Sequence, residues 1–385
     1  MTDSALSRPG ERDRLVVKFG QIDWTFCLVL TLITGAGALM LYSIAGASWT
    51  PWALPHLARY AVFFAMMIVL AMVDLRVWFA IAYPVYALGF ALLVGVEIMG
   101  DIALGAQRWI ELPLLGRFQP SEVMKIGIVL ALARFYHGLS GDKAKFSWWL
   151  LIPAALIAAP VALVAKQPDL GTALLIAATG GAMMILAGLS LRIVGLGIAA
   201  AAAAAPMVYF FFLHDYQRQR VLTFLDPESD PSGSGYHIMQ SKIALGSGGL
   251  LGKGFGLGSQ SQLNFLPEKQ TDFIFATLAE EFGFVGCVSI LALYATIIFM
   301  CLRIAMISHS HFGRLCAAGV TITFAAYVLI NGAMVMGLAP VVGVPMPLLS
   351  WGGTVMITVM VGFALVQSVR VHRYSEVTSG KGALM

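Results

Sequence analysis

Long apolar stretches separated by short polar ones dominate the chain from residue 24 to residue 371. A helix needs about 20 mostly apolar residues to cross the hydrocarbon core of a membrane. The pattern predicts ten such helices, over residues 24–44, 57–73, 77–98, 120–137, 148–165, 170–188, 191–213, 272–302, 314–338 and 349–371. The predicted fold class is an all-α polytopic integral membrane protein, with residues 1–385 forming a single membrane domain.

One long polar segment interrupts this pattern, over residues 214–271, between the seventh and eighth predicted helices. It is rich in Gly, Ser and Asp-Pro, and its segment 237–245 has the pattern of a short amphipathic helix at the membrane interface. We expect a large loop here, because nothing about anchoring helices in lipid requires such a stretch. It is the first place to look for chemistry.

The composition agrees with a membrane protein, since 59% of residues are hydrophobic, 11% are charged and the mean hydropathy is +0.84. A soluble domain carries about 25% charged residues. The basic residues also predict an orientation, because cytoplasmic segments of membrane proteins are enriched in Lys and Arg. With the N-terminus inside, the short outer loops hold only Arg108, Arg117 and Lys166. The cytoplasmic segments hold fourteen: Arg8, Arg12, Arg14, Lys18, Arg76, Arg134, Lys143, Lys145, Arg192, Arg303, Arg314, Arg370, Arg373 and Lys381.

This asymmetry predicts cytoplasmic tails over residues 1–23 and 372–385, and it places the 214–271 loop outside the cytoplasm. The net charge of +4 sorts by loop in this way, so no nucleic-acid partner is expected. The glycine-rich segment 246–258 lacks the spacing of a nucleotide-binding P-loop, and no strand pattern precedes it. The four cysteines are far apart and lie in apolar surroundings, which favours buried thiols over a metal site.

Two polar clusters accompany the predicted fourth and sixth helices. Glu122 and Lys125 are three residues apart and therefore share a helix face. They can form an internal ion pair, or Glu122 can orient Lys125 so that it binds an anionic headgroup together with Arg108. Asp169 can cap the sixth helix through its carboxylate, or it can shape an outer pocket.

Asp272 is the third candidate, at the point where the polar loop meets the eighth predicted helix. Thr271 is a plausible N-cap, which would put Asp272 in the first turn, where the helix dipole favours its ionised form. Burial would oppose ionisation. Glu280 and Glu281 lie two turns further along, and a membrane helix carries such a pair only if they are satisfied or functional. Asp272 is either a first-turn acid that complements the dipole or a catalytic group.

Four stretches together resemble the SEDS family (shape, elongation, division and sporulation) of bacterial cell-wall synthesis. They are residues 118–125, residues 166–172, residues 235–249 with 266–275, and residues 331–353. Glu228, the Tyr236–Ile238 segment and the Gln260–Leu263 segment are more similar to the elongation (RodA) branch than to the division (FtsW) branch, which is the near alternative. The chain departs mildly from the family pattern at Met346 and at Leu349–Trp351.

The resemblance implies a peptidoglycan glycosyltransferase that joins a lipid-linked glycan to lipid II, releases polyprenyl diphosphate and serves cell elongation and rod shape. Asp272 matches the family's catalytic carboxylate, and the implied substrate-binding residues are Arg108, Glu122, Lys125, Asp169 and Gln262. The resemblance also implies a divalent cation, Mg²⁺, although no ligand set is readable from the sequence. The implied location is the bacterial plasma (inner) membrane, and the implied partners are a class B penicillin-binding protein, which is a transpeptidase, and other elongation-complex membrane proteins.

Two other functions fit part of the pattern. A lipid II flippase or an ion-coupled carrier would place polar groups on broken helices near the middle of the membrane. The polar clusters gather on the outer side instead, which favours surface chemistry. A scaffold that only recruits a transpeptidase would not need Asp272.

Overall fold

The computed structural model describes residues 11–99, 101–103, 106–112, 116–139, 148–211, 215–230, 233–375 and 377. Each of the ten predicted spans forms a helix, which confirms the predicted fold class. In chain order these helices are α2 (Trp24–Ile44), α3 (Ala53–Ala71), α4 (Leu75–Met99), α5 (Pro120–His137), α7 (Leu151–Lys166, preceded by the short 3-10 helix η1, Trp148–Leu150), α8 (Leu170–Leu186), α9 (Leu191–Phe211), α13 (Ile274–Ile307), α14 (His311–Val335) and α15 (Gly353–Val371).

Not all ten helices are equally suited to a membrane by length and composition. Within the part of the chain that the structure describes, seven are long and apolar enough to cross one: α2, α3, α4, α7 together with η1, α13, α14 and α15. α8 and the apolar part of α9 are shorter. α5 has 18 residues, but three of them are the charged residues Glu122, Lys125 and Arg134. The least apolar helix of the bundle is therefore one that carries candidate site residues.

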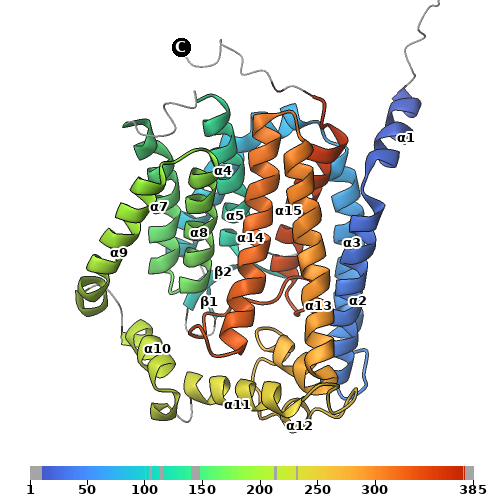
Figure 1. Ribbon diagram of the computed structural model, residues 1–385, viewed down its shortest axis with the longest axis vertical. Helices are drawn as coiled ribbons and strands as arrows, with labels where there is room; N and C mark the ends of the chain where they lie inside the picture. The colour runs from blue at the N-terminus through green and yellow to red at the C-terminus, as the bar shows by residue number, and fades with distance from the viewer. Residues whose placement is uncertain are drawn as a thin grey trace, which may run out of the picture.

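The two ends of the bundle differ in what they carry (Figure 1). The helix α1 (Glu11–Gln21) and the C-terminal end of α15 lie at one end. The helices α10 (Asp215–Leu225), α11 (Ser234–Ser247) and α12 (Ser259–Gln262), which come from the predicted large loop, lie at the other end. Seven predicted spans separate α1 from the polar loop, and an odd number of spans places the two at opposite ends of the bundle.

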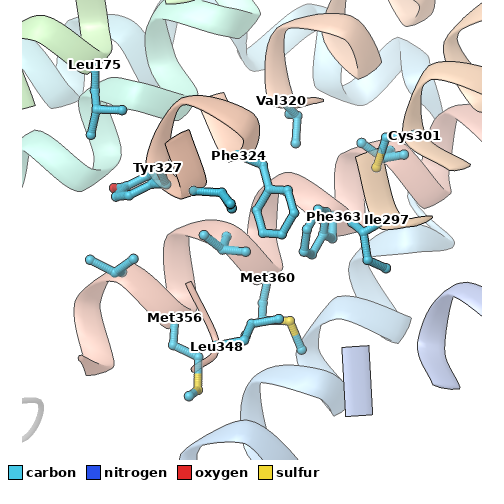
Figure 2. Packing of buried hydrophobic residues seen from close by; sticks show 14 of the residues in the cluster. Leu175, Ile297, Cys301, Val320, Phe324, Tyr327, Leu348, Met356, Met360 and Phe363 are labelled. Atoms are coloured by element: carbon cyan, nitrogen blue, oxygen red, sulfur yellow. The ribbon is translucent and has the colours of Figure 1, made fainter. Parts of the chain in front are cut away.

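Aromatic and sulfur-containing side chains fill the centre of the bundle (Figure 2). Phe324 of α14 and Phe363 of α15 meet edge to face with their ring centroids 4.9 Å apart. Ile297 and Cys301 of α13 approach the same rings. All four cysteines are free thiols, and three of them are buried, as the sequence predicts. This apolar centre holds α13, α14 and α15 in fixed positions, and all three lead to the candidate site.

The sequence does not predict a break in α13 at Gly283, where the backbone adopts φ 63° and ψ −157°. α13 therefore consists of two helical segments, residues 274–282 and 284–307. Every side chain from Ile274 to Glu281 is buried, whereas Phe284 and Val285 are exposed. At about 1.5 Å per residue the second segment alone is about 36 Å long, enough to cross a membrane. The first segment is instead packed inside the protein, and it positions the turn that precedes it.

Three short antiparallel strands between α4 and α5 are a second feature that the periodicity does not predict. β1 (Asp101–Ala103), β2 (Ala106–Leu112) and β3 (Gly116–Phe118) pair in the order β1-β2-β3. β1 and β3 have only three residues each, too few positions to show an alternating pattern. The sheet occupies the predicted outer loop that contains Arg108.

Candidate active site around Asp272

Asp272 lies in the turn that leads into the first segment of α13. The helix begins at Ile274 with Phe273 as its N-cap, and no side chain bonds to the exposed N–H groups there. The prediction of Thr271 as N-cap, with Asp272 in the first turn, is therefore wrong. The Thr271 hydroxyl donates instead to the carbonyl and to the carboxylate of Glu268, at 3.2 and 3.1 Å, which holds the turn rather than the helix end.

The backbone of this turn is fixed by two contacts with distant segments. The Asn331 amide of α14 donates to the carbonyl oxygen of Asp272 at 2.8 Å and to that of Val344 at 2.7 Å. The Trp351 N–H donates to the carbonyl oxygen of Gln270 at 2.8 Å. Asn331 is fully buried, so its two bonds are shielded from water. The position of Asp272 is thus set by α14 and by the segment that precedes α15.

The Asp272 carboxylate itself accepts no hydrogen bond from any residue that the structure describes. It is partly exposed, yet the surrounding protein removes much of its hydration. Burial and the charge of Glu268 raise the pKa of Asp272 to about 7, while the positive charge of Arg220 acts in the opposite direction. A carboxyl group with a pKa near neutral pH and no internal partner can remove a proton from a bound substrate.

Asp169 lies close enough for its charge to raise the pKa of Asp272 as well. One of its oxygens accepts from the backbone N–H of Thr172 at 3.1 Å, so it caps α8 as the sequence predicts. The other accepts from the Gln119 side chain at 2.9 Å, which ties the start of α5 to the start of α8. The two interpretations of Asp169 are therefore compatible, because a cap residue also faces the Asp272 region.

Glu122 and Lys125 form the predicted pair, with 2.6 Å between Lys125 Nζ and Glu122 Oε1. Both side chains are almost completely buried, at 1% and 2% exposure. Lys125 also donates to the Tyr327 hydroxyl, and its ammonium lies 4.6 Å from the centre of that ring. Tyr327 comes from α14, about two hundred residues away in the chain, so no local spacing could reveal it. Binding of a substrate by Lys125 stays a prediction, and it would require exchange of one of these partners.

The remaining two predicted substrate-binding residues are placed less directly. Gln262 ends α12, and its side chain donates to the carbonyl oxygen of Ser43 at the end of α2, at 2.9 Å. It therefore connects the loop to the bundle in this structure. Arg108 belongs to β2, but its side chain lies outside the described residues. Their roles in substrate binding stay predictions.

Sequence reasoning missed the way the polar loop is fastened to the break in α13. The fully buried Glu280 accepts from Lys253 Nζ at 2.6 Å, from the Ser259 hydroxyl at 2.9 Å and from the Gln260 N–H at 3.1 Å. Glu281 accepts from the Ser43 hydroxyl at 2.5 Å. The loop therefore satisfies Glu280, and α2 binds one oxygen of Glu281, whereas the buried Oε2 of Glu281 has no hydrogen-bond partner within the described residues.

Close backbone contact explains why the loop is rich in glycine. The N–H groups of Lys253 and Gly254 donate to the carbonyls of Glu280 and Glu281, and those of Phe284 and Val285 donate to Gly249 and Leu250. The break at Gly283 leaves these α13 groups without helical partners. Such close backbone contact excludes side chains, since a Cβ at position 252 would lie 2.1 Å from the Glu281 carbonyl oxygen. The glycine-rich segment therefore packs its backbone directly against the broken part of α13, and we call this contact the seal over the α13 break.

A polytopic helical membrane protein with an unpaired carboxylate at its loop-bearing end is the class that this fold and site define. The chain belongs to the FtsW/RodA/SpoVE family, whose family model is described as "Cell cycle protein" and matches residues 21–375. The family resemblance predicted from the sequence is therefore confirmed.

Similar proteins and structures support the same assignment. Peptidoglycan glycosyltransferase MrdB of Escherichia coli K12 is 46% identical over 353 residues, covering 91% of this chain and 94% of that protein. A probable peptidoglycan glycosyltransferase FtsW of Trichlorobacter lovleyi is 34% identical, covering 88% and 90%. A chain of a peptidoglycan synthase complex, described in terms of the coordination of polymerization and crosslinking, is 31% identical with a TM-score of 0.78, covering 92% and 99%. The rod shape determining protein RodA of Thermus thermophilus is 28% identical with a TM-score of 0.66, covering 92% and 98%.

Proposed function

We propose that this protein polymerises peptidoglycan glycan strands for cell elongation, with Asp272 as the general base. The chain is a peptidoglycan glycosyltransferase, since relatives with that name match it over nearly its whole length. One observation of the site carries the assignment to Asp272. Its carboxylate has no internal hydrogen-bond partner among the described residues, while Asn331 fixes its backbone from a buried position.

The chemistry requires such a group. A hydroxyl of the acceptor sugar, lipid II, attacks the anomeric carbon of the lipid-linked glycan, and the bond from that carbon to the polyprenyl diphosphate breaks. A sugar hydroxyl is a weak nucleophile, so a carboxylate that takes its proton as the new bond forms lowers the barrier. The pKa of Asp272, raised to about 7 by burial and by Glu268, makes it a stronger base than an ordinary aspartate. A single base that activates the attacking hydroxyl predicts inversion at the anomeric carbon.

The departing diphosphate gains negative charge, which cations held in a partly dry groove can stabilise. Arg108 and Lys125 are the proposed protein groups, and Glu122 would position Lys125 until the substrate arrives. Asp169 and Gln262 would help to shape the binding groove through their bonds to Gln119 and Ser43.

The residues present also fit a Mg²⁺ ion that is shared with substrate. No group of three or more His, Cys, Asp and Glu side chains in the described part of the chain could hold a metal alone. Mg²⁺ usually binds through one or two carboxylates together with substrate phosphates, and Asp272 with its neighbour Glu268 offers these. Such an ion would neutralise charge on the diphosphate.

The location and partners follow from the same proposal. The protein is a multi-pass membrane protein, and we place it in the bacterial plasma membrane with both termini in the cytoplasm and Asp272 on the extracytoplasmic side. Fourteen basic residues in the predicted cytoplasmic segments, against three in the short outer loops, support this orientation. The similarity to a chain of a peptidoglycan synthase complex supports a class B penicillin-binding protein as partner. Other elongation-complex membrane proteins are further proposed partners.

Polymerisation in detergent tests this function. Purified wild-type protein with lipid II and Mg²⁺ should produce glycan strands on a gel, with and without the transpeptidase partner, whereas Asp272→Asn should produce almost none while keeping its folded state and its partner. A flippase needs two leaflets and would show no reaction in micelles. Full activity of the Asp272→Asn protein would support the scaffold function instead. The division role of the FtsW branch is tested separately, by complementation of rod shape against complementation of septation.

A further inference from the structure

Arg59 lies in the second turn of α3, at the end of the bundle that carries the polar loop. Its guanidinium carbon lies over the Trp351 ring, 4.1 Å from the ring centre, in a cation–π contact. It also lies against the start of α15, where a Cβ at position 353 would be 3.5 Å from Arg59 Nη1. The side chain is half-buried between α3 and the segment before α15. Trp351 thus holds the guanidinium in one place.

The five N–H donors of this guanidinium find no hydrogen-bond acceptor within the described residues. No carboxylate oxygen in that part of the chain lies within ion-pair distance, and no carbonyl or hydroxyl accepts a hydrogen bond from it. Two other arginines show the contrast. Arg134 donates to the carbonyls of Phe79 and Ala80, and Arg370 donates to Gln21 and to Asp23. A cation that is partly withdrawn from water and left without an acceptor favours an anionic ligand.

Arg59 is joined to the candidate active site through its stacking partner. Trp351 donates its backbone N–H to Gln270, which precedes Asp272 by two residues. On the same helix as Arg59, His56 contacts the carbonyl oxygen of Leu348 at 3.0 Å, so α3 is fastened to this segment at two points. The unpaired guanidinium and the unpaired carboxylate therefore sit on one connected frame, with Trp351 and Gln270 between them.

We propose that Arg59 binds a phosphate group carried by a lipid. Arginine matches phosphate geometry because its planar fork presents two parallel N–H donors to two oxygens. No described residue uses these N–H donors, so the fork is available for this contact. Two lipids carry the required group at this level of the membrane, namely the lipid-linked diphosphate of the proposed reaction and an ordinary phospholipid. The first source rests on the proposed function, and the second does not.

The alternative is that Arg59 is an arginine at the membrane interface whose N–H groups bind only water. That alternative predicts no loss of ligand affinity when the charge is removed. Loss of one charge-assisted bidentate contact should instead weaken phosphate binding by about tenfold.

Direct binding tests this inference without turnover. The probe is a fluorescent polyprenyl diphosphate, measured in phospholipid-free detergent with the full-length protein. We expect Arg59→Gln to raise its Kd about tenfold and Arg59→Lys to raise it less, because lysine keeps the charge without the fork. The matched control is Arg76→Gln, which removes an exposed arginine from the start of α4 at the opposite end of the bundle and should leave the Kd unchanged. Thermal unfolding of each variant checks that it is folded.

A second arm identifies the source of the phosphate. If Arg59→Gln leaves diphosphate binding unchanged but loses phosphatidylglycerol adducts in native mass spectrometry, the ligand is a phospholipid headgroup. If both measurements equal those of the wild type and of Arg76→Gln, the proposal is overturned. Should Arg59→Gln fail to fold, the comparison of Arg59→Lys with wild type decides, and an unchanged Kd there counts against the bidentate contact. If the wild-type protein binds the probe but makes no glycan, the proposed function is refuted, whereas the proposed phosphate contact of Arg59 is not.

Discussion

The buried amide of Asn331 binds the backbone carbonyl of Asp272 at 2.8 Å, and through the same nitrogen it binds Val344 at 2.7 Å. The candidate catalytic residue is thereby positioned through its backbone, while its carboxylate is left free. This division separates the groups that position the acid from the groups that would react. It also means that position and reactivity can be altered by different mutations.

Loss of the Asn331 bonds should reduce turnover without changing the chemistry of the acid. We expect Asn331→Ala to lower kcat by about tenfold, because small displacements of a reacting group are costly, and to keep the pH profile of the wild type. Thr323→Val is the control, since it removes the 3.0 Å hydrogen bond to Thr179 from the same helix without touching the turn. Wild-type kcat for Asn331→Ala in a folded protein would contradict this role.

The pH dependence of polymerisation should report the pKa of Asp272. A general base works when ionised, so the rate should rise with pH and reach half its maximum near pH 7. Glu268→Gln removes a neighbouring negative charge, which makes ionisation easier and lowers this pKa. The acid limb of the profile should therefore move to lower pH in that variant. Glu97→Gln removes a carboxylate that is paired with Lys166 and should leave the limb in place.

The same shift has a consequence for stability. Since the pKa of Asp272 is higher in the folded chain than its ordinary value of 3.8, folding favours the protonated form, and the folded state loses stability as pH rises from about 4 to about 7. Asp272→Asn removes this cost. Its unfolding temperature at pH 8 should equal or exceed that of the wild type, although its activity is nearly abolished. A marked decrease would show that the carboxylate contributes to structure.

A paired substitution separates the two interpretations of Lys125. Lys125→Met leaves Glu122 buried without its cation, which should cost about 3–5 kcal/mol of stability. Adding Glu122→Gln removes the unpaired charge and should restore most of that loss. If Lys125 binds the departing diphosphate, the double variant stays inactive despite its recovered stability. Recovery of activity together with stability would reduce Lys125 to a structural partner of Glu122 and Tyr327.

The seal over the α13 break can be tested by adding single methyl groups. Gly252 has φ +81°, and a Cβ there would lie 2.1 Å from the Glu281 carbonyl oxygen. Gly252→Ala should therefore destabilise the protein by about 2 kcal/mol or more, measured by thermal unfolding. Gly246→Ala is the matched control in the last turn of α11, where nothing lies within 4 Å of the added methyl. It should be neutral or slightly stabilising, because alanine favours a helix over glycine.

The sequence predicts the features that depend on neighbouring residues. Ten apolar runs give ten helices, the three-residue spacing of Glu122 and Lys125 gives their ion pair, and Asp169 before an apolar run gives a cap. The site also contains contacts between residues far apart in the chain, such as Tyr327 with Lys125 and Trp351 with Gln270. No local periodicity encodes these.

The start of α13 and its break show why the sequence does not predict some details of the site. Thr271 has the residue type of an N-cap, but its hydroxyl donates to Glu268 instead. The helix therefore begins at Ile274. Gly283 lies inside an apolar run, and the sequence pattern predicts a continuous helix through it. The backbone groups of the loop, from Gly249 to Gly254, supply the hydrogen-bond partners that the break removes.

The break in α13 also dictates an order of assembly during biosynthesis. Two adjacent carboxylates would cost several kcal/mol to insert into a membrane as part of a continuous span, whereas residues 284–307 contain a single charged residue, Arg303. Lys253 pairs with Glu280 and Ser43 binds Glu281, and both precede these acids in the chain, so they are synthesised first. We therefore expect the turn that contains Asp272 to reach its final position last, because Asn331 and Trp351, which fix its backbone, are synthesised after it.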